Sequence, residues 1–292
     1  MEETSFVELH CHSTASDGTA SPREVVRAAH EAGLTGLALT DHDTVAGCAD
    51  AADEAATLGI DFIPGIEISC EFPRPGTMHL LGYGVDPRSP VLHDLTRRLI
   101  AGRNERNVKI VESLRAQNVA ITIDEVLDQA KGGTVGRPHF AAILVRKGYV
   151  KSAQEAFNKY LGQSGSTYVD KETVNAKRAI EMIRESGGLP VLAHPVQLKR
   201  ENFGQLENTV KELADYGLAG IETIHSDHRE ILIEELFDLA RRFNLIPTGG
   251  SDFHGSSKPH IRLGWAGSRR VPREMFDRLR DAIAAGHAKV GA

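Results

Sequence analysis

Short apolar runs alternate with helical patterns in the first ninety residues, and again from about residue 173 onward. Apolar runs bounded by turn residues predict strands, here at Phe6–Leu9, Thr35–Leu39, Asp61–Ser69, Met78–Gly82, Leu189–Ala193, Ala219–Ile224 and Leu245–Gly249. Helical patterns lie between or after them, at Pro22–Ala32, Ala46–Leu58, Asn175–Glu185, Leu206–Tyr216, Arg229–Phe243 and Pro272–Ala285. This alternation is typical of parallel β/α units, so the sequence predicts an α/β fold.

The pattern changes at the turn cluster Asp86–Pro90. Only helical patterns follow it, at Val91–Gln117, Ile123–Ala130, Pro138–Lys147 and Ser152–Leu161. We interpret residues 88–172 as a helical insertion, and residues 1–87 and 173–292 as the two parts of one catalytic barrel. A chain of 292 residues is long enough for a single barrel with such an insertion.

Histidines and carboxylates recur where the predicted strands end. His10-Cys11-His12 closes the first strand, in which residues two apart point to the same side. Equivalent positions are held by Asp17, Asp41-His42-Asp43, Glu67, His79, His194 and Ser251-Asp252-Phe253-His254. Because the C-terminal strand ends of a parallel barrel form one active-site face, we expect these side chains to converge.

These residue types point to metal chemistry. The candidate ligands are three acids and six histidines without a thiolate, a set that suits zinc, manganese or iron in a catalytic site. Nine donors exceed the needs of one tetrahedral site, so we expect two or three divalent cations. The alternative, a set of unrelated surface and core polar residues, does not account for their recurrence at strand ends.

Composition adds limits on the setting. Hydrophobic residues make up 41% and charged residues 25%, as in ordinary globular proteins. Met1–Thr4 is acidic and leads directly into a predicted strand, and no apolar run approaches the ~20 residues that cross a bilayer. Cys11, Cys48 and Cys70 have no paired spacing, which fits a reducing compartment. We therefore expect a cytoplasmic protein with no membrane partner.

Charge is distributed unevenly along the chain. The formal net charge is −6, which argues against a general nucleic-acid binder, yet residues 88–159 hold 13 Lys and Arg against 7 Asp and Glu. A basic segment in an acidic protein can attract a phosphorylated substrate toward acidic metal ligands. Solvated helix faces are the alternative explanation of the same charges.

The strand-end residues resemble the motifs of the PHP (polymerase and histidinol phosphatase) superfamily. The matching residues are His10-Cys11-His12 with Asp17, Thr40-Asp41-His42-Asp43, Gly65-Ile66-Glu67, His79, Ala193-His194-Pro195 and Ser251-Asp252-Phe253-His254. The resemblance implies a distorted (β/α)7 barrel in which Glu67 bridges two ions and is essential to catalysis. The three ion sites that it implies are His10, His12, Glu67 and Asp252; Glu67, His79 and His194; and Asp17, His42 and His254. Asp17 stands where several relatives carry histidine.

The insertion carries a narrower resemblance, in Arg137-Pro138-His139-Phe140 and Phe157-Asn158-Lys159-Tyr160-Leu161. It is similar to the stand-alone branch that hydrolyses AMP-like monophosphates and nucleoside 3′,5′-bisphosphates. The resemblance places the insertion over the site as a lid. Arg103, Arg137 and Lys159 are therefore candidate phosphate-binding residues, with solvated helix faces as the alternative.

Two kinds of supporting residue complete the set of candidates. His228, which the resemblance favours over His225, is a candidate to protonate the leaving group or to bind phosphate; an exposed loop histidine without a role is the alternative. Asp43 is a candidate to orient His42 or a water molecule, and a turn cap is its alternative.

The residues together predict a phosphoric monoester hydrolase acting on a small phosphorylated substrate, with a hydroxide bridging two ions as the nucleophile. One alternative is a 5′–3′ exonuclease on short RNA or DNA, which an open basic groove would favour, whereas a pocket capped by the insertion would favour the nucleotide phosphatase. Long nucleic acid is not the expected partner. Histidinol phosphate hydrolysis is a further alternative. A degenerate barrel with a structural or regulatory role predicts lost ligands, and none of the expected ligand positions is lost.

Overall fold

Seven strands form a distorted barrel in the computed structural model, which describes residues 5–290. The strands are β1 (Phe6–Cys11), β2 (Leu34–Leu39), β3 (Asp61–Cys70), β4 (Met78–Tyr83), β5 (Leu189–Leu192), β6 (Gly220–His225) and β7 (Ile246–Gly250), with the short β8 (Val271–Pro272) at the edge. Their order is β7-β6-β5-β4-β3-β2-β1-β8. After β7, the Asp252 amide donates to the His10 carbonyl at 2.8 Å and the His12 amide donates to the Phe253 carbonyl at 2.9 Å, which brings the chain after β7 against β1. The predicted α/β barrel is confirmed.

The distortion lies at β3 and β4. The first half of β3 pairs in parallel with β2, up to the pair of Leu39 with Pro64. From Gly65 onward β3 pairs antiparallel with β4, which is also antiparallel to β5. Glu67 therefore lies just beyond the point where β3 changes partner, although the strand itself continues to Cys70.

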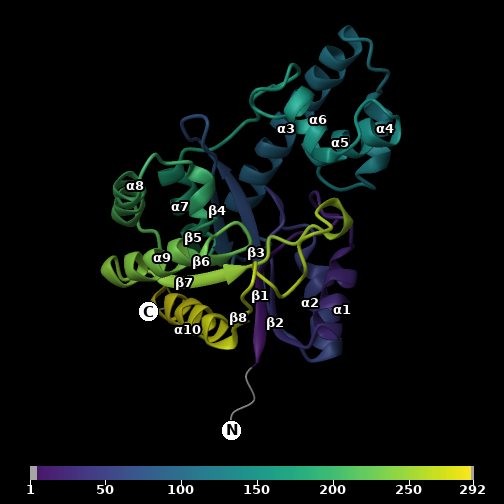
Figure 1. Cartoon of the computed structure of the whole chain (residues 1–292). Coiled ribbons are helices and arrows are strands. Elements are labelled where there is room, and N and C mark those ends of the chain that lie inside the picture. The colour runs from purple at the N-terminus through teal and green to yellow at the C-terminus, as the bar shows by residue number, and fades with distance from the viewer. Residues whose placement is uncertain (1–4, 291–292) are drawn as a thin grey trace.

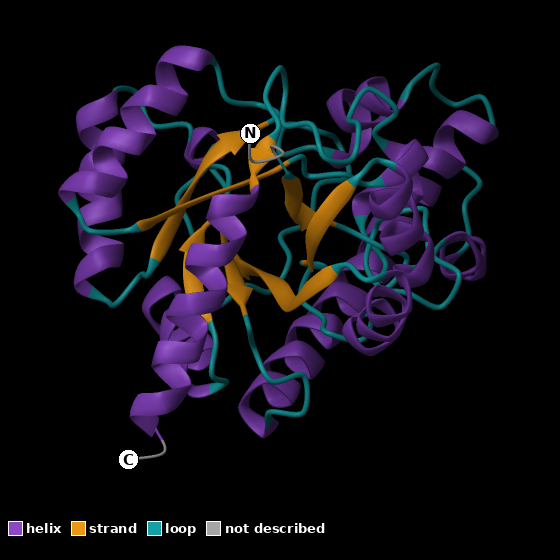
Figure 2. Cartoon of the chain, turned by 90° about the horizontal axis from the view of Figure 1, so that it is seen from below, coloured by secondary structure: helices purple, strands orange, loops and turns teal. Residues whose placement is uncertain are grey.

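Helices cover the outside of the barrel and its lower end (Figures 1 and 2). They are α1 (Pro22–Glu31), α2 (Cys48–Leu58), α7 (Ala176–Glu185), α8 (Phe203–Asp215), α9 (Glu230–Arg242) and α10 (Arg273–Val290), with one-turn 3-10 helices at Pro195–Leu198 and Gly255–Ser257. The start of α1 follows from its sequence, because Ser21 and Glu24 form a reciprocal capping box and Pro22 is at the first position. Near the start of α10, Phe276 and Leu279 are buried with strand residues such as Val7.

A helical segment lies between β4 and α7. It consists of α3 (Pro90–Ala116), α4 (Ile123–Gln129), α5 (Arg137–Arg146), α6 (Ala153–Ala156) and a π-helical turn (Phe157–Leu161). Figure 1 shows α4, α5 and α6 gathered around the far end of α3. The four helical patterns were thus correctly predicted, although the last one is split in two. The exact domain boundaries stay a prediction.

The long helix α3 belongs to two apolar cores. Leu92 and Leu99 in its first half pack with the barrel, whereas Ile110 and Leu114 pack with α4, α5 and the π-helical turn. The buried side chains between these two halves are polar, namely Arg103, Arg106 and Asn107. Within residues 5–290, no helix is both long and apolar enough to cross a membrane.

Candidate metal centre

The structure brings all nine predicted metal ligands together at the strand ends. Their ligand atoms form overlapping groups whose members lie within 4.8 Å of one another: His12, Asp17, His42 and His254; His10, Glu67 and His194; His10, His12 and Asp252; and His42, Glu67 and His79. Each ligand lies in a barrel strand or in the loop that follows one. The barrel therefore converges the side chains in space, as the strand-end pattern predicted.

Glu67 is at the centre of the cluster. Its Oε1 lies 2.8 Å from His79 Nδ1 and 2.8 Å from His194 Nε2. Its Oε2 lies 2.8 Å from His42 Nδ1 and 3.3 Å from His12 Nε2. Burial by itself would raise the pKa of Glu67, but the surrounding histidines hold that pKa well below its usual range. An ionised carboxylate with imidazoles at both oxygens is suited to bridging two cations.

The cluster also leaves buried polar atoms without hydrogen-bond partners. Although some of them lie at ion-pair distance from one another, the following atoms have no partner of hydrogen-bond geometry among the described residues: His10 Nε2, both ring nitrogens of His12, Asp17 Oδ1, His42 Nδ1, Glu67 Oε2 and His194 Nδ1. A buried polar group without a partner costs about 1–3 kcal/mol, so this concentration of them needs a physical reason. Burial by itself would lower the pKa of His10, yet Glu222 and Glu67 raise it well above its ordinary value. The carboxylate charge thus calls for compensating positive charge, and divalent cations fit both the charge and the donor set.

Asp252 supplies a second carboxylate to the same cluster. Its Oδ1 lies 3.3 Å from His12 Nε2 and 3.7 Å from His10 Nε2. Its Oδ2 lies 2.6 Å from Lys258 Nζ, a contact that the sequence did not predict. One oxygen therefore faces the histidines while Lys258 holds the other.

The loop that carries Asp17 is anchored by Asp41. The Asp41 carboxylate accepts hydrogen bonds from the Ser13 amide at 2.8 Å, the Ser13 hydroxyl at 2.7 Å and the Ser16 hydroxyl at 2.6 Å. In this loop, Asp17 Oδ1 lies 3.3 Å from His254 Nε2. Asp41 is thus a positioning residue, which the sequence analysis included in a motif but left without a role.

Glu222, a fully buried carboxylate in β6, was not predicted from the sequence. Its Oε1 is 2.9 Å from His10 Nδ1, and its Oε2 accepts a hydrogen bond of 2.6 Å from the His194 amide. A carboxylate behind a ligating histidine fixes the ring orientation and its tautomer. The available signal was a lone acid inside the predicted strand Ala219–Ile224.

Asp43 and Arg103 bind each other instead of the groups that were predicted for them. The Asp43 carboxylate accepts bonds from the Ser69 amide at 2.8 Å, the Ser69 hydroxyl at 3.0 Å and Arg103 Nε at 2.8 Å. No described hydrogen bond joins Asp43 to His42. Arg103 is buried in this ion pair and is not among the residues that line the pocket described next. That Asp43 orients His42 or a water molecule and that Arg103 contacts substrate stay predictions, which these contacts do not favour.

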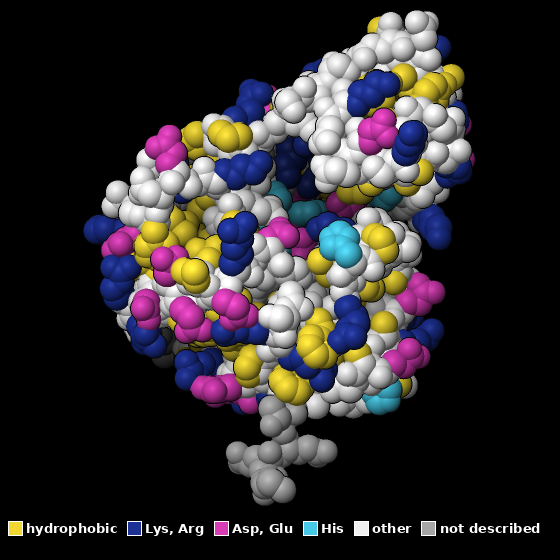
Figure 3. Space-filling model, viewed as in Figure 1, with side chains coloured by type: hydrophobic (Ala, Val, Ile, Leu, Met, Phe, Trp, Pro, Cys, Tyr) yellow, Lys and Arg dark blue, Asp and Glu magenta, His cyan; other side chains and the backbone are white. Residues whose placement is uncertain are grey.

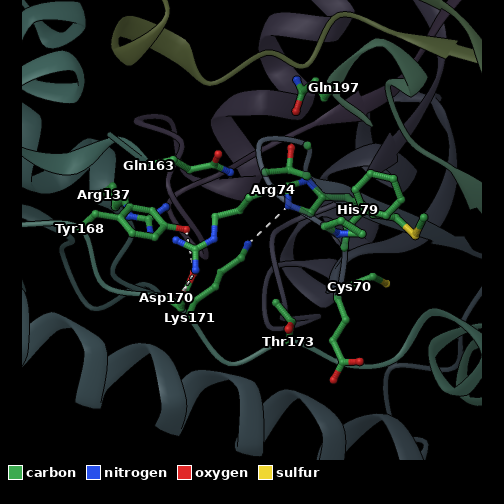
Figure 4. Close-up of a pocket in the computed structure, with 16 residues that line it drawn as sticks. Cys70, Arg74, His79, Arg137, Gln163, Tyr168, Asp170, Lys171, Thr173 and Gln197 are labelled. Atoms are coloured by element: carbon green, nitrogen blue, oxygen red, sulfur yellow. Dashed lines mark hydrogen bonds and ion pairs between the residues drawn. The ribbon is translucent and has the colours of Figure 1, made fainter. Parts of the chain in front are cut away.

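A pocket of about 600 Å³ adjoins the cluster at His79. The barrel contributes Cys70, Met78 and His79 to its wall, and the helical segment with the chain that follows it contributes Arg137, Gln163, Tyr168 and Lys171. Figure 4 shows Arg137 and Tyr168 at one end of the pocket and His79 at the other. Figure 3 shows the hollow beneath the helical segment, with histidine and acidic side chains visible in it. This volume falls in the range of small-molecule sites, roughly 300–1,000 Å³.

Of the predicted phosphate-binding cations in the helical segment, only Arg137 lines this pocket. Its guanidinium carbon lies 4.5 Å from the centre of the Tyr168 ring, and its Nη2 donates to the Val169 carbonyl at 2.8 Å. Lys159 is exposed, and its ammonium lies 4.9 Å from the Tyr160 ring centre. Lys159 is not part of the pocket wall, which favours the alternative of a solvated helix face over a substrate contact.

His225, the last residue of β6, and His228, in the loop that follows, are both buried. His225 is the nearer of the two to the candidate metal ligands, with its Nε2 3.8 Å from Asp252 Oδ2. The Nδ1 of His228 lies 2.9 Å from the Thr223 carbonyl and its Nε2 has no partner. Burial lowers the pKa of His228 to about 4, so the ring is neutral near pH 7 with Nε2 as an acceptor. This argues against His228 as the proton donor and leaves it a candidate for binding substrate.

A barrel whose strand ends hold buried histidines and carboxylates in overlapping ligand groups defines a metal-dependent hydrolase. The family model of the PHP domain matches residues 8–218, and the chain belongs to this family. This confirms the resemblance drawn from the strand-end motifs.

Curated relatives cover most of the chain. A 5′-3′ exoribonuclease of Haemophilus influenzae is 35% identical over 86% of this chain and 90% of its own. A 3′,5′-nucleoside bisphosphate phosphatase of Chromobacterium violaceum is 35% identical over 85% and 87%. A phosphoribosyl 1,2-cyclic phosphate 1,2-diphosphodiesterase of Eggerthella lenta is 32% identical over 87% and 97%.

A crystal structure from Bifidobacterium adolescentis, described as that of a metal-dependent phosphoesterase, superimposes with a TM-score of 0.84. The two chains are 30% identical, and the match covers 95% of this chain and 96% of the other. The chain is a metal-dependent phosphoesterase of the PHP family.

Proposed function

We propose that the protein hydrolyses a phosphomonoester of a nucleotide, either an AMP-like monophosphate or a nucleoside 3′,5′-bisphosphate. The observation that carries this proposal is the pocket of about 600 Å³ between His79 of the cluster and Arg137 of the helical segment. Its size suits one nucleotide, and its position lets a phosphate reach the cluster while the rest of the molecule stays under the segment. The helical segment acts as the lid in this proposal.

The ions would be held by the three ligand sets that the family resemblance implies. They are His10, His12, Glu67 and Asp252; Glu67, His79 and His194; and Asp17, His42 and His254. The structure groups some of these donor atoms differently, with His42 beside Glu67 and His79 and with His10 beside Glu67 and His194. When bound, divalent ions supply an activated water near neutral pH and neutralise phosphate charge. Manganese, zinc and iron all suit these donors.

The protein's own residues orient and shield the reacting groups. Glu222 Oε1 orients the ring of His10, which belongs to the first ligand set. Glu222 Oε2 accepts a hydrogen bond from the backbone amide of His194, which belongs to the second set. Arg137 binds a phosphate oxygen or stacks with Tyr168 against the nucleoside. His228, whose Nε2 has no partner, stays a candidate substrate contact outside the wall of this pocket. Together these groups exclude bulk water and fix the phosphate for in-line attack.

The 5′-3′ exoribonuclease is the second candidate, since one relative of this name is 35% identical to the chain. Both candidates use the same ligands and differ in what the pocket admits. The covered pocket favours the mononucleotide, because a strand longer than about one nucleotide would have to leave it past the helical segment.

Phosphate release from a substrate panel tests the proposal. The panel contains AMP, adenosine 3′,5′-bisphosphate, histidinol phosphate and a ribose 1,2-cyclic phosphate, each with Mn²⁺, Zn²⁺ or Fe²⁺. We expect a nucleotide to have the highest kcat/KM, with activity lost on chelation and restored by metal. A higher kcat/KM for histidinol phosphate or the cyclic phosphate would refute the proposed substrate class.

A further inference from the structure

Four cationic side chains gather where the helical segment meets the barrel: Arg103, Arg106, Arg137 and Lys171. Arg103 and Arg106 are buried, whereas Arg137 and Lys171 are partly buried and line the pocket. The positive charge of Arg103 lowers the pKa of the other three groups, in each case after burial as the larger cause. We call these four residues the cationic cluster.

Among the described ion pairs, the cationic cluster contacts one buried carboxylate, that of Asp43, which forms an ion pair with Arg103. Within the part of the chain that the structure describes, Arg106 donates only to the Asn107 side chain and the Val135 carbonyl. The nearby Asp170 is 63% exposed and is paired with Arg74. Partly buried cations in excess of carboxylates are costly unless an anion compensates them.

Lys171 is the member of this cluster that points toward the metal centre. Its Nζ hydrogen-bonds with the Ser69 hydroxyl and lies 3.4 Å from His79 Nε2. Figure 4 shows the side chain reaching across the pocket toward His79. Its backbone is fixed three residues later, where the Val174 amide donates to the Ser69 carbonyl at 3.2 Å. The ammonium group is therefore held at the passage between the pocket and the metal centre.

We propose that Lys171, with Arg137 beside it and Arg103 and Arg106 behind it, forms an anion subsite that binds a phosphate group of the substrate and does not require the metal ions. This inference rests on the proposed function, since it names protein groups that hold the substrate's phosphate. An ammonium group provides up to three donors to phosphate oxygens, and the guanidinium of Arg137 adds a planar pair. The excess positive charge supplies the driving force.

Binding of inorganic phosphate to the full chain tests the subsite. Calorimetry is performed at constant ionic strength, with chloride as the control anion, on protein loaded with Mn²⁺ and on chelated protein whose fold is checked by circular dichroism. Lys171→Gln keeps a polar side chain beside Ser69 but removes the charge, and we expect it to weaken phosphate binding at least about tenfold in both forms. Lys171→Arg should retain binding within a few fold. Lys159→Gln is the matched control, because it removes an exposed lysine outside the pocket, and it should bind like the wild type.

Equal phosphate affinity of the wild type and Lys171→Gln would overturn the subsite, even if nucleotides are hydrolysed normally. Equal losses in Lys171→Gln and Lys171→Arg would also overturn it, because they would indicate a structural role for this side chain. Conversely, the expected binding pattern together with no turnover of any nucleotide would refute the proposed function and leave the subsite intact.

Discussion

The strand ends and the helical segment above them fix their functional residues in different ways. At the strand ends, the pairing of β1 with β2 and of β3 with β4 brings His10 and Glu67 to the same end of the barrel, and His12 lies one residue past β1. In the helical segment, helical periodicity leaves the direction of a polar side chain open until the helices pack. Arg137 faces the pocket, whereas Lys159 faces solvent. Ligand positions follow from local geometry, and substrate contacts follow from tertiary packing.

The largest effect is expected from Glu67→Gln, at the centre of the strand-end cluster. The amide keeps the shape but removes the charge that faces histidines on both oxygens. We expect loss of activity by orders of magnitude and of at least one equivalent of metal, measured by kinetics and elemental analysis. Glu31→Gln, an exposed acid at the end of α1, is the control. Near-wild-type turnover with full metal content would remove Glu67 from the metal centre.

A smaller loss is expected from Glu222→Gln, which leaves every predicted ligand in place. Replacing the carboxylate that contacts His10 Nδ1 weakens the contact that fixes the orientation of the His10 ring, so metal affinity should fall about 10–100-fold. Titration with a competing chelator measures this affinity, and excess metal should restore part of the activity. Unchanged affinity would mean that Glu222 only fills space in β6.

Arg137→Ala tests the other region and should have a milder effect. If Arg137 binds substrate, its loss should raise KM or lower kcat/KM, by a factor that corresponds to a free energy of about 1–3 kcal/mol. The metal content should stay unchanged. Arg146→Ala on the same helix and Lys159→Ala are the controls, because both side chains are exposed. Kinetics identical to these controls would assign Arg137 to packing against Tyr168 alone.

The same contrast explains how much could be predicted from the sequence. The barrel, the helical patterns and the clustering of the nine candidate ligands followed from strand endings and motif spacing. Glu222 was missed because its partner His10 lies 212 residues away, and Lys171 because it lies outside any regular element. The ion pair of Asp43 with Arg103 joins a loop to α3 across 60 residues, which no local pattern encodes. The contacts of Arg103 and Lys171 depend on how the segment docks onto the barrel, whereas the contact of Glu222 with His10 depends on how β6 and β1 come together within it.

The most direct test of the central claim, a covered pocket for one nucleotide, is kcat/KM across a chain-length series. The series contains AMP, adenosine 3′,5′-bisphosphate and 5′-phosphorylated oligonucleotides of two to ten residues, all with the same metal. Because Arg137 of the helical segment and the chain that follows it line the pocket, we predict that the nucleotides are the best substrates and that kcat/KM falls as the chain grows. Efficient, processive degradation of the longest strand would contradict the account, although the metal centre would survive that result.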